Sequence, residues 1–137
     1  MKRVVWDRQQ EVGEWVCARI EGKFHPDSAT AIGIERGGML VGGCVFETYT
    51  GQSVLIHAAG TSRFWMNRDF LKAVFGYAFN QLKVKKMIGP VDSANRDSRN
   101  FIENLGFTPE AVIADGARHG DLILYTLRRQ DCRFLGE

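Results

Sequence analysis

Three neighbouring segments in the first half of the chain are mostly apolar and lack the spacing of a helix. These segments cover residues 30–34, 39–49 and 53–59, and glycine-containing turns at 36–38 and 50–52 separate them. Short apolar runs bounded by turn signals are typical of buried strands. Because turns this short join antiparallel neighbours, the pattern predicts a three-stranded antiparallel meander.

Three other segments show the spacing of amphipathic helices. Residues 8–20 follow a short apolar strand at residues 4–6, and Asp7 is a candidate N-cap for that helix. Residues 68–82 carry a wide apolar stripe, which predicts a long helix packed against a sheet. Residues 95–106 begin with an asparagine and end with a glycine, which are preferred caps of a short helix.

The remaining apolar segments complete the order of elements. Residues 85–91 are predicted to form a buried strand, and residues 111–114 and 122–127 a closing hairpin. The full order is strand, helix, three-stranded meander, helix, strand, helix and two strands. This order predicts an α+β fold with a strand–helix–strand crossover in its middle, built as one domain over residues 1–137.

Composition and charge exclude several classes of protein. Of the 137 residues, 45% are hydrophobic and 25% are charged, as in ordinary globular domains. A net charge of +2 is too small to indicate a nucleic-acid partner, and no apolar run is long enough to span a membrane. Cys17, Cys44 and Cys132 are widely spaced, which favours free thiols in a reducing compartment over a disulfide or a metal site. We therefore predict a cytoplasmic protein without a metal.

The segment "NRDSRNFIENLGF", residues 95–107, together with the order of elements resembles the GCN5-related N-acetyltransferase (GNAT) superfamily. The ending "DLILYTLRRQDCRFL" is similar to that of enzymes that acetylate the N-termini of ribosomal proteins, and small phage and prophage acetyltransferase-like proteins look similar as well. The resemblance implies a GNAT-like mixed sheet of about seven strands with three to four helices. It also implies that two central parallel strands splay apart and hold acetyl-coenzyme A (acetyl-CoA) in the cleft between them.

Asn95 and Ser98 stand at the start of the short helix. The residues alone predict Asn95 as an N-cap whose side chain accepts a backbone N–H. The resemblance implies in addition that Asn95 contacts the pantetheine arm of the cofactor and that Ser98 faces the same cleft. It further implies that the strand end formed by Ala58, Ala59 and Gly60 borders the cofactor.

The loop between Gly60 and Asn67 is a candidate phosphate site. The first turn of a helix presents free N–H groups to an anion, and Arg63 and Arg68 would add positive charge. The family pattern here is Gln/Arg-x-x-Gly-x-Gly/Ala, but this chain has only Gly60, followed by "TSRFWMN". Two interpretations stay open. One is a rebuilt clamp in which Trp65 stacks on the ligand, and the other is an ordinary loop with Asn67 as N-cap and Trp65 over the edge of the core.

Transfer to an amine requires a base, because only the unprotonated amine attacks a thioester. His57 and Glu47, on adjacent predicted strands, are the candidate bases, with solvent water as the alternative. The resemblance implies a tyrosine as general acid at the position of Ile102, where isoleucine cannot donate a proton. Cys44 has no evident activating neighbour and is interpreted as a small buried side chain.

The leading hypothesis is an N-acetyltransferase that moves an acetyl group from acetyl-CoA to an amine by direct attack on the thioester. The sequence does not select among a peptide N-terminus, a lysine and a small molecule as the acceptor. The departures in the phosphate loop and at Ile102 motivate a second hypothesis, a binding module of the same fold that no longer catalyses. A third hypothesis is a phage-type enzyme that modifies a nucleobase with another group. A homodimer that forms through the last strands is a further hypothesis.

Overall fold

The computed structural model describes residues 1–62 and 64–135 and contains the predicted elements in the predicted order. The strands are β1 (Lys2–Val5), β2 (Thr30–Arg36), β3 (Met39–Glu47), β4 (Ser53–Gly60), β5 (Lys86–Asp92), β6 (Thr108–Ile113) and β7 (Leu122–Arg128). The helices are α1 (Gln9–Arg19), α2 (Arg68–Gly76) and α3 (Arg96–Asn104), with a π-helical turn η1 (Tyr77–Gln81) after α2 and a short 3-10 turn η2 (Arg129–Asp131) after β7. The prediction of an α+β fold is confirmed.

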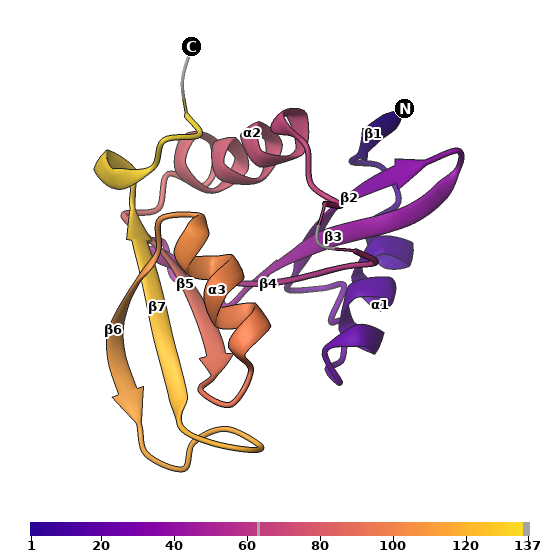
Figure 1. Ribbon diagram of the computed structural model, residues 1–137. Coiled ribbons are helices and arrows are strands. Elements are labelled where there is room, and N and C mark those ends of the chain that lie inside the picture. Colours follow the sequence, from indigo (N-terminus) through magenta and orange to yellow (C-terminus); the bar gives the residue numbers. More distant parts are fainter. Residues whose placement is uncertain (63, 136–137) are drawn as a thin grey trace.

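The strands form one mixed sheet in the order β1-β2-β3-β4-β5-β7-β6. The predicted meander is present, with β3 paired antiparallel to both β2 and β4. β4 and β5 run parallel, because α2 and η1 cross over between them. Figure 1 shows the two parts of the sheet, β1–β4 and β5–β7, spreading apart from the junction of β4 with β5.

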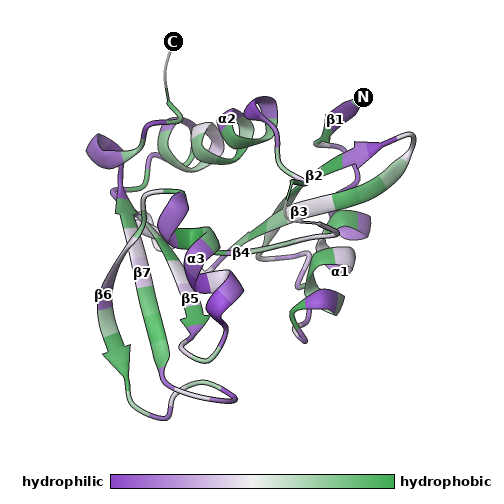
Figure 2. Ribbon diagram, viewed as in Figure 1, coloured by the Kyte–Doolittle hydropathy of each residue, from purple (hydrophilic) through white to green (hydrophobic). Residues whose placement is uncertain are grey.

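The helices cover the two faces of the sheet unequally. α1 packs on β2, β3 and β4, whereas α2 and α3 lie on the opposite face (Figure 1). Each face has its own hydrophobic cluster, centred on residues such as Val12 and Val45 on the α1 side and Phe70 and Phe75 on the other. Figure 2 shows hydrophilic residues on the outward turns of α1 and α3, as burial of one helix face requires. No helix in the described ranges is long and apolar enough to cross a membrane.

Two local predictions are wrong. Arg8 takes the N-cap position of α1 and its side chain makes no capping hydrogen bond, although the sequence predicts a cap at Asp7. The helix predicted over residues 68–82 is not uniform, because its last part is η1, a wider π-helical turn.

Trp65 fastens the loop between β4 and α2 to the sheet. Its side chain is buried over Gly42 of β3 and Gly60 of β4, which are register partners. A Cβ atom at Gly42 would stand 1.9 Å from the indole, and one at Gly60 would stand 2.1 Å from it. The indole also makes an edge contact with Phe70, at 5.1 Å between ring centroids, and stacks on Phe101 of α3. The two glycines therefore leave the space that the indole fills.

Gly42→Ala is expected to destabilise the protein by about 1–3 kcal/mol, because the added methyl group overlaps the Trp65 ring and forces it to move. Urea unfolding measures this change. Gly76→Ala is the matched control: its Cβ atom would lie 3.9 Å from the nearest neighbour, and alanine in a helix stabilises by about 0.5–1 kcal/mol relative to glycine. Equal stabilities of Gly42→Ala and the wild type would show that Trp65 is not seated on this glycine.

Candidate active site

Pairing between the parallel strands β4 and β5 is confined to their first residues. The register ends at the pair Leu55–Ile88, whereas β4 continues to Gly60 and β5 to Asp92. Beyond that pair the strands separate, as the resemblance implies. A cavity of about 720 Å³ opens in the gap and reaches both α1 and α3. This volume lies in the range of ordinary ligand pockets.

The open edge of β4 turns backbone groups toward this cavity. Thr61 donates its N–H to the Val41 carbonyl, in register with the β3–β4 ladder. In an antiparallel ladder the backbone groups of every second residue point to the same neighbour. The N–H and C=O groups of Ala58 and Gly60 therefore point away from β3, toward the side from which β5 has separated. These groups are available to a ligand that carries amides.

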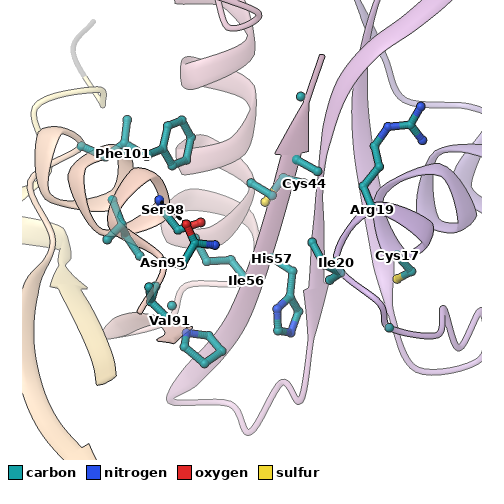
Figure 3. Close-up of a pocket in the computed structure, with 18 of the residues that line it drawn as sticks. Cys17, Arg19, Ile20, Cys44, Ile56, His57, Val91, Asn95, Ser98 and Phe101 are labelled. Atoms are coloured by element: carbon teal, nitrogen blue, oxygen red, sulfur yellow. Dashed lines mark hydrogen bonds between the residues drawn. The ribbon is translucent and has the colours of Figure 1, made fainter. Parts of the chain in front are cut away.

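α3 forms the opposite wall. Asn95 is its N-cap, and the Asn95 Oδ1 accepts a hydrogen bond from the Ser98 N–H at 3.1 Å. The predicted cap is confirmed, and the amide NH2 group of Asn95 stays available as a donor at the mouth of the cleft. Figure 3 shows Asn95 and Ser98 on α3, with Ile56 and His57 of β4 across the cleft from them.

The two candidate bases form one hydrogen-bonded pair. The Nε2 atom of His57 lies 2.6 Å from Oε2 of Glu47. The side chains meet because they are diagonal neighbours on one face of the sheet: His57 is the register partner of Val45, two residues before Glu47. Both line the cavity and are partly exposed, at 23% for His57 and 30% for Glu47. When His57 donates this hydrogen bond from Nε2–H to the Glu47 carboxylate, Nδ1 is the ring nitrogen with a free lone pair.

The inner end of the cavity is apolar. Gly89 of β5 leaves space there for Ile102 of α3, because a Cβ atom at Gly89 would lie 2.3 Å from Ile102 Cδ1. Cys44 lines the cavity from β3 and is almost fully buried, and this burial raises the pKa of its thiol. A neutral thiol is a poor nucleophile, which supports the interpretation of Cys44 as a small core side chain.

Tyr125 does not stand in for the missing general acid. Its side chain is fully buried, and its hydroxyl donates a hydrogen bond to Oε2 of Glu103 at 2.6 Å. Burial, together with this contact, raises the pKa of the phenol. Tyr125 is also absent from the residues that line the cavity.

The end of α1 and the end of β5 also border the cavity. Ile20 and Lys23 line it near the end of α1, and Asp92 lines it at the end of β5. The Asp92 carboxylate accepts the N–H of Ala94 at 3.0 Å and that of His119 at 2.9 Å, and these two hydrogen bonds lower its pKa. Asp92 thereby ties the turn before α3 to the loop between β6 and β7 and holds the wall in place.

The structure brings most of the predicted site residues to this one cavity. Those that line it are Glu47, His57, Ala58, Ala59, Gly60, Asn95 and Ser98. Trp65 and Arg68 do not line it: Trp65 is buried over the sheet, and Arg68 is exposed at the first position of α2. Arg63, the other predicted phosphate contact, lies outside the described residues.

The first turn of α2, on which the prediction of a phosphate site rests, is present in the structure. Asn67 caps α2, with its side chain accepting the Phe70 N–H at 2.8 Å. Met66 lines the cavity, and Lys2 Nζ donates to the Phe64 carbonyl at 2.5 Å. The loop is thus anchored to β1 and, through the neighbouring indole, to β3 and β4.

Sequence reasoning misses several parts of the cavity wall. Gly89 and Pro90 of β5 line it, as do Cys17, Arg19 and Ile20 near the end of α1. The Gly-Pro dipeptide is a usable signal, because proline lacks the N–H that a fully paired central strand needs. The α1 residues carry no such signal, since their approach depends on how the helix crosses the sheet.

No family model and no curated protein matches the sequence. Solved structures, in contrast, match over most of the chain. A putative acetyltransferase from Salmonella typhimurium, yncA, whose structure includes its cofactor acetyl-CoA, has 15% sequence identity and a TM-score of 0.71, and the match covers 99% of this chain and 95% of that one. The chain has the GNAT fold.

Two other matching structures are acetyltransferases whose names give different acceptors. The ribosomal-protein-S5-alanine acetyltransferase from Vibrio fischeri is 13% identical, with a TM-score of 0.64 and coverage of 90% of this chain and 72% of that one. The spermidine/spermine N-acetyltransferase SpeG from Vibrio cholerae is 16% identical, with a TM-score of 0.65 and coverage of 77% and 70%. The GNAT fold by itself therefore selects no acceptor.

Proposed function

We propose that this GNAT domain is an N-acetyltransferase that transfers an acetyl group from acetyl-CoA to an amine. The observation that carries the proposal is the cavity between β4 and β5. It joins the open backbone edge of β4 to the His57–Glu47 pair in one space. A thioester arm in the gap and an amine beside His57 would therefore meet.

The residues of the cleft fit the arm of acetyl-CoA. Ala58 and Gly60 would pair their backbone groups with its amides, in the way that a peptide adds to a strand edge. The Asn95 NH2 group would donate to a carbonyl of the arm, and Ser98 adds a hydroxyl on the same wall. When bound, the cofactor supplies the acetyl group as a reactive thioester. Ile102 keeps the inner end of the cleft apolar.

His57 would accept the proton that the amine loses on attack. Glu47 holds the imidazole through Nε2 and would stabilise the cation that forms when Nδ1 takes up this proton. Because both side chains are partly exposed, solvent can then carry the proton away. Positioned bases of this kind contribute about 10²–10⁴-fold to a rate.

The absence of a tyrosine at Ile102 is compatible with turnover. A thiol has a pKa of about 8.5, so a thiolate leaves readily and water can protonate it. Ser98 is the one residue of the predicted set on α3 that brings a hydroxyl to the cavity wall.

A second function, binding without catalysis, is favoured by two features of the same site. Trp65 is packed over Gly60, where the family pattern has a glycine-rich phosphate loop, and Ile102 takes the position of the acid. A protein of this kind would bind acetyl-CoA and release it unchanged.

Acetyl-CoA at a hundredfold excess over its Kd should stabilise the folded protein by about 2.7 kcal/mol. For a domain of this size the melting temperature then rises by roughly 10 °C. Asn95→Ala should reduce the shift, because loss of one hydrogen bond to the ligand costs about 1 kcal/mol. Thermal melts with and without the cofactor measure both effects.

Asn95→Asp is the control that separates the cap from the ligand contact. Aspartate keeps an oxygen for the Ser98 N–H but lacks the NH2 donor. It should therefore melt near the wild type without ligand and yet show the reduced shift. If both variants show the full rise in melting temperature with acetyl-CoA, Asn95 is a helix cap and not a ligand contact. If the melting temperature of the wild type does not rise at all, the proposed function is refuted.

His57→Gln should lower kcat by about a hundredfold and leave the Kd for acetyl-CoA unchanged, because it removes the base and not the cofactor wall. Glu47→Gln should have a smaller effect, since it removes only the charge that holds the imidazole. Acetylation of a panel containing a peptide N-terminus, a lysine peptide and spermidine supplies the rates. Wild-type turnover in His57→Gln would refute the assigned base, and binding without any turnover in the wild type would favour the second function.

A further inference from the structure

A second hollow adjoins the cavity of the candidate active site. It has a volume of about 800 Å³ and shares Arg19, Ile20, Asp92 and Asn95 with the cavity. The end of α1 forms one of its walls, and the turn before α3 together with the β6–β7 loop forms the other. The first wall belongs to the half of the sheet made by β1–β4 and the second to the half made by β5–β7. This outer hollow therefore lies between solvent and the cavity.

One ion pair joins the two walls of the outer hollow. Nε of Arg118, in the β6–β7 loop, lies 3.1 Å from Oε1 of Glu21, which follows α1. Among the described residues, no other hydrogen bond or ion pair connects residues 20–29 with residues 93–97 or 114–121. Figure 1 shows the β6–β7 loop extending toward the lower end of α1. The Glu21–Arg118 pair, here called the strap, thus links the two halves of the sheet on this side of the cavity.

The backbone of Glu21 has a conformation that favours glycine. Its φ angle is +58°, in the left-handed region. The Gly22 N–H donates to the Cys17 carbonyl at 2.8 Å, which closes the last turn of α1 and leaves Glu21 in the left-handed position after the helix. Helices that end in this way usually have glycine there, because a side chain is disfavoured. The glutamate side chain is therefore present at a conformational cost, and the strap is its polar contact.

The β6–β7 loop holds Arg118 in place. The His119 N–H donates to Oδ2 of Asp92 at 2.9 Å, and the Asp121 N–H donates to Oγ of Ser93 at 2.8 Å. These bonds fasten the loop to the end of β5. The two side chains of the strap are 65% and 66% exposed, so water replaces the lost contact when the pair opens. Exposed pairs of this kind shift an equilibrium by about two- to fivefold.

We propose that the strap selects acceptors by size. The inference rests on the proposed acetyl transfer and adds the class of acceptor. An amine on a slender chain reaches His57 while the strap is closed, whereas an amine on the surface of a folded protein has to open it first. The reason is steric, since an acceptor that enters through the outer hollow passes between the two walls that the ion pair holds together. The selection against bulky acceptors amounts to the about two- to fivefold effect of breaking an exposed pair.

The accessibility of Cys17 tests the strap without any acetyl transfer. Cys17 lines the cavity and is 5% exposed, whereas Cys44 is 1% exposed. In a Cys132→Ser parent, the uncharged and bulky reagent pyrene maleimide should label Cys17 about two- to fivefold faster once Arg118→Gln is added. The small N-ethylmaleimide should label Cys17 equally fast in both. Salt at about 1 M should accelerate the bulky reagent in the parent but not in the variant, because salt screens an exposed ion pair.

Arg96→Gln is the matched control for these rates. Arg96 is exposed, lines the outer hollow and makes no ion pair among the described residues, so its loss removes the same charge without opening the strap. This variant should label like the parent. The double variant Glu21→Arg with Arg118→Glu exchanges the charges and should restore slow labelling. Equal rates in Arg118→Gln and the parent would overturn the proposal, as would the same acceleration in Arg96→Gln.

Acceptor kinetics test the selection itself. In Arg118→Gln, kcat/KM for the surface amines of ubiquitin, a folded protein, should rise by about two- to fivefold, whereas kcat/KM for n-butylamine should stay unchanged. Equal changes for the two acceptors would overturn selection by size. If the wild type acetylates no amine at all, the proposed transfer fails and the selection of acceptors fails with it. Faster labelling of Cys17 in Arg118→Gln would in that case still establish the strap as a gate to the cavity.

Discussion

The early end of hydrogen bonding between β4 and β5 is the constraint on which the rest of the structure depends. Adjacent parallel strands normally pair along their length, because buried backbone groups without partners cost free energy. Here pairing stops at Leu55 and Ile88, and the hydrophobic cluster under α2 and α3 spans both parts of the sheet. Pro90 lies just beyond the last pair and lacks an N–H to continue a ladder. The separated strands therefore leave a cavity with polar edges in the middle of the domain.

Because side chains alternate along β4, the residues of this strand that line the cavity lie on both faces of the sheet. Ile56 belongs to the cluster under α2 and α3, whereas the neighbouring His57 lies on the α1 side with Glu47. Between them the backbone of the strand borders the gap. An acetyl donor held along the edge of β4 would thus have apolar walls on one side. On the other side it would have the His57–Glu47 pair as a proton acceptor. The same alternation continues on β5, where the buried residues Met87, Gly89 and Val91 are separated by half-buried ones.

Several features of the fold are predicted from local signals in the sequence. Glycine turns between short apolar segments predict the meander, and the Asn95 cap follows from residue preferences alone. Features that depend on register are not predictable in this way. His57 and Glu47 stand as separate candidate bases in the sequence, and only the β3–β4 register joins them into a pair.

The burial of Trp65 is another feature that the sequence alone does not predict. In the sequence it stands in a polar loop as a candidate ligand contact, yet in the structure it is 5% exposed. Its burial requires Gly42 and Gly60 to be neighbours across two strands, which no short segment reveals.

Hydrogen exchange at the backbone amides of β4 tests the central claim most directly. Ala58 and Gly60 should exchange quickly in the free protein, whereas His57 and Ala59 in the same strand bond to β3 and should be protected. Acetyl-CoA should slow exchange at Ala58 and Gly60 by at least about tenfold and leave the other two amides unchanged. Equal protection of all four amides in the free protein would mean that β4 and β5 stay paired, and would contradict the account.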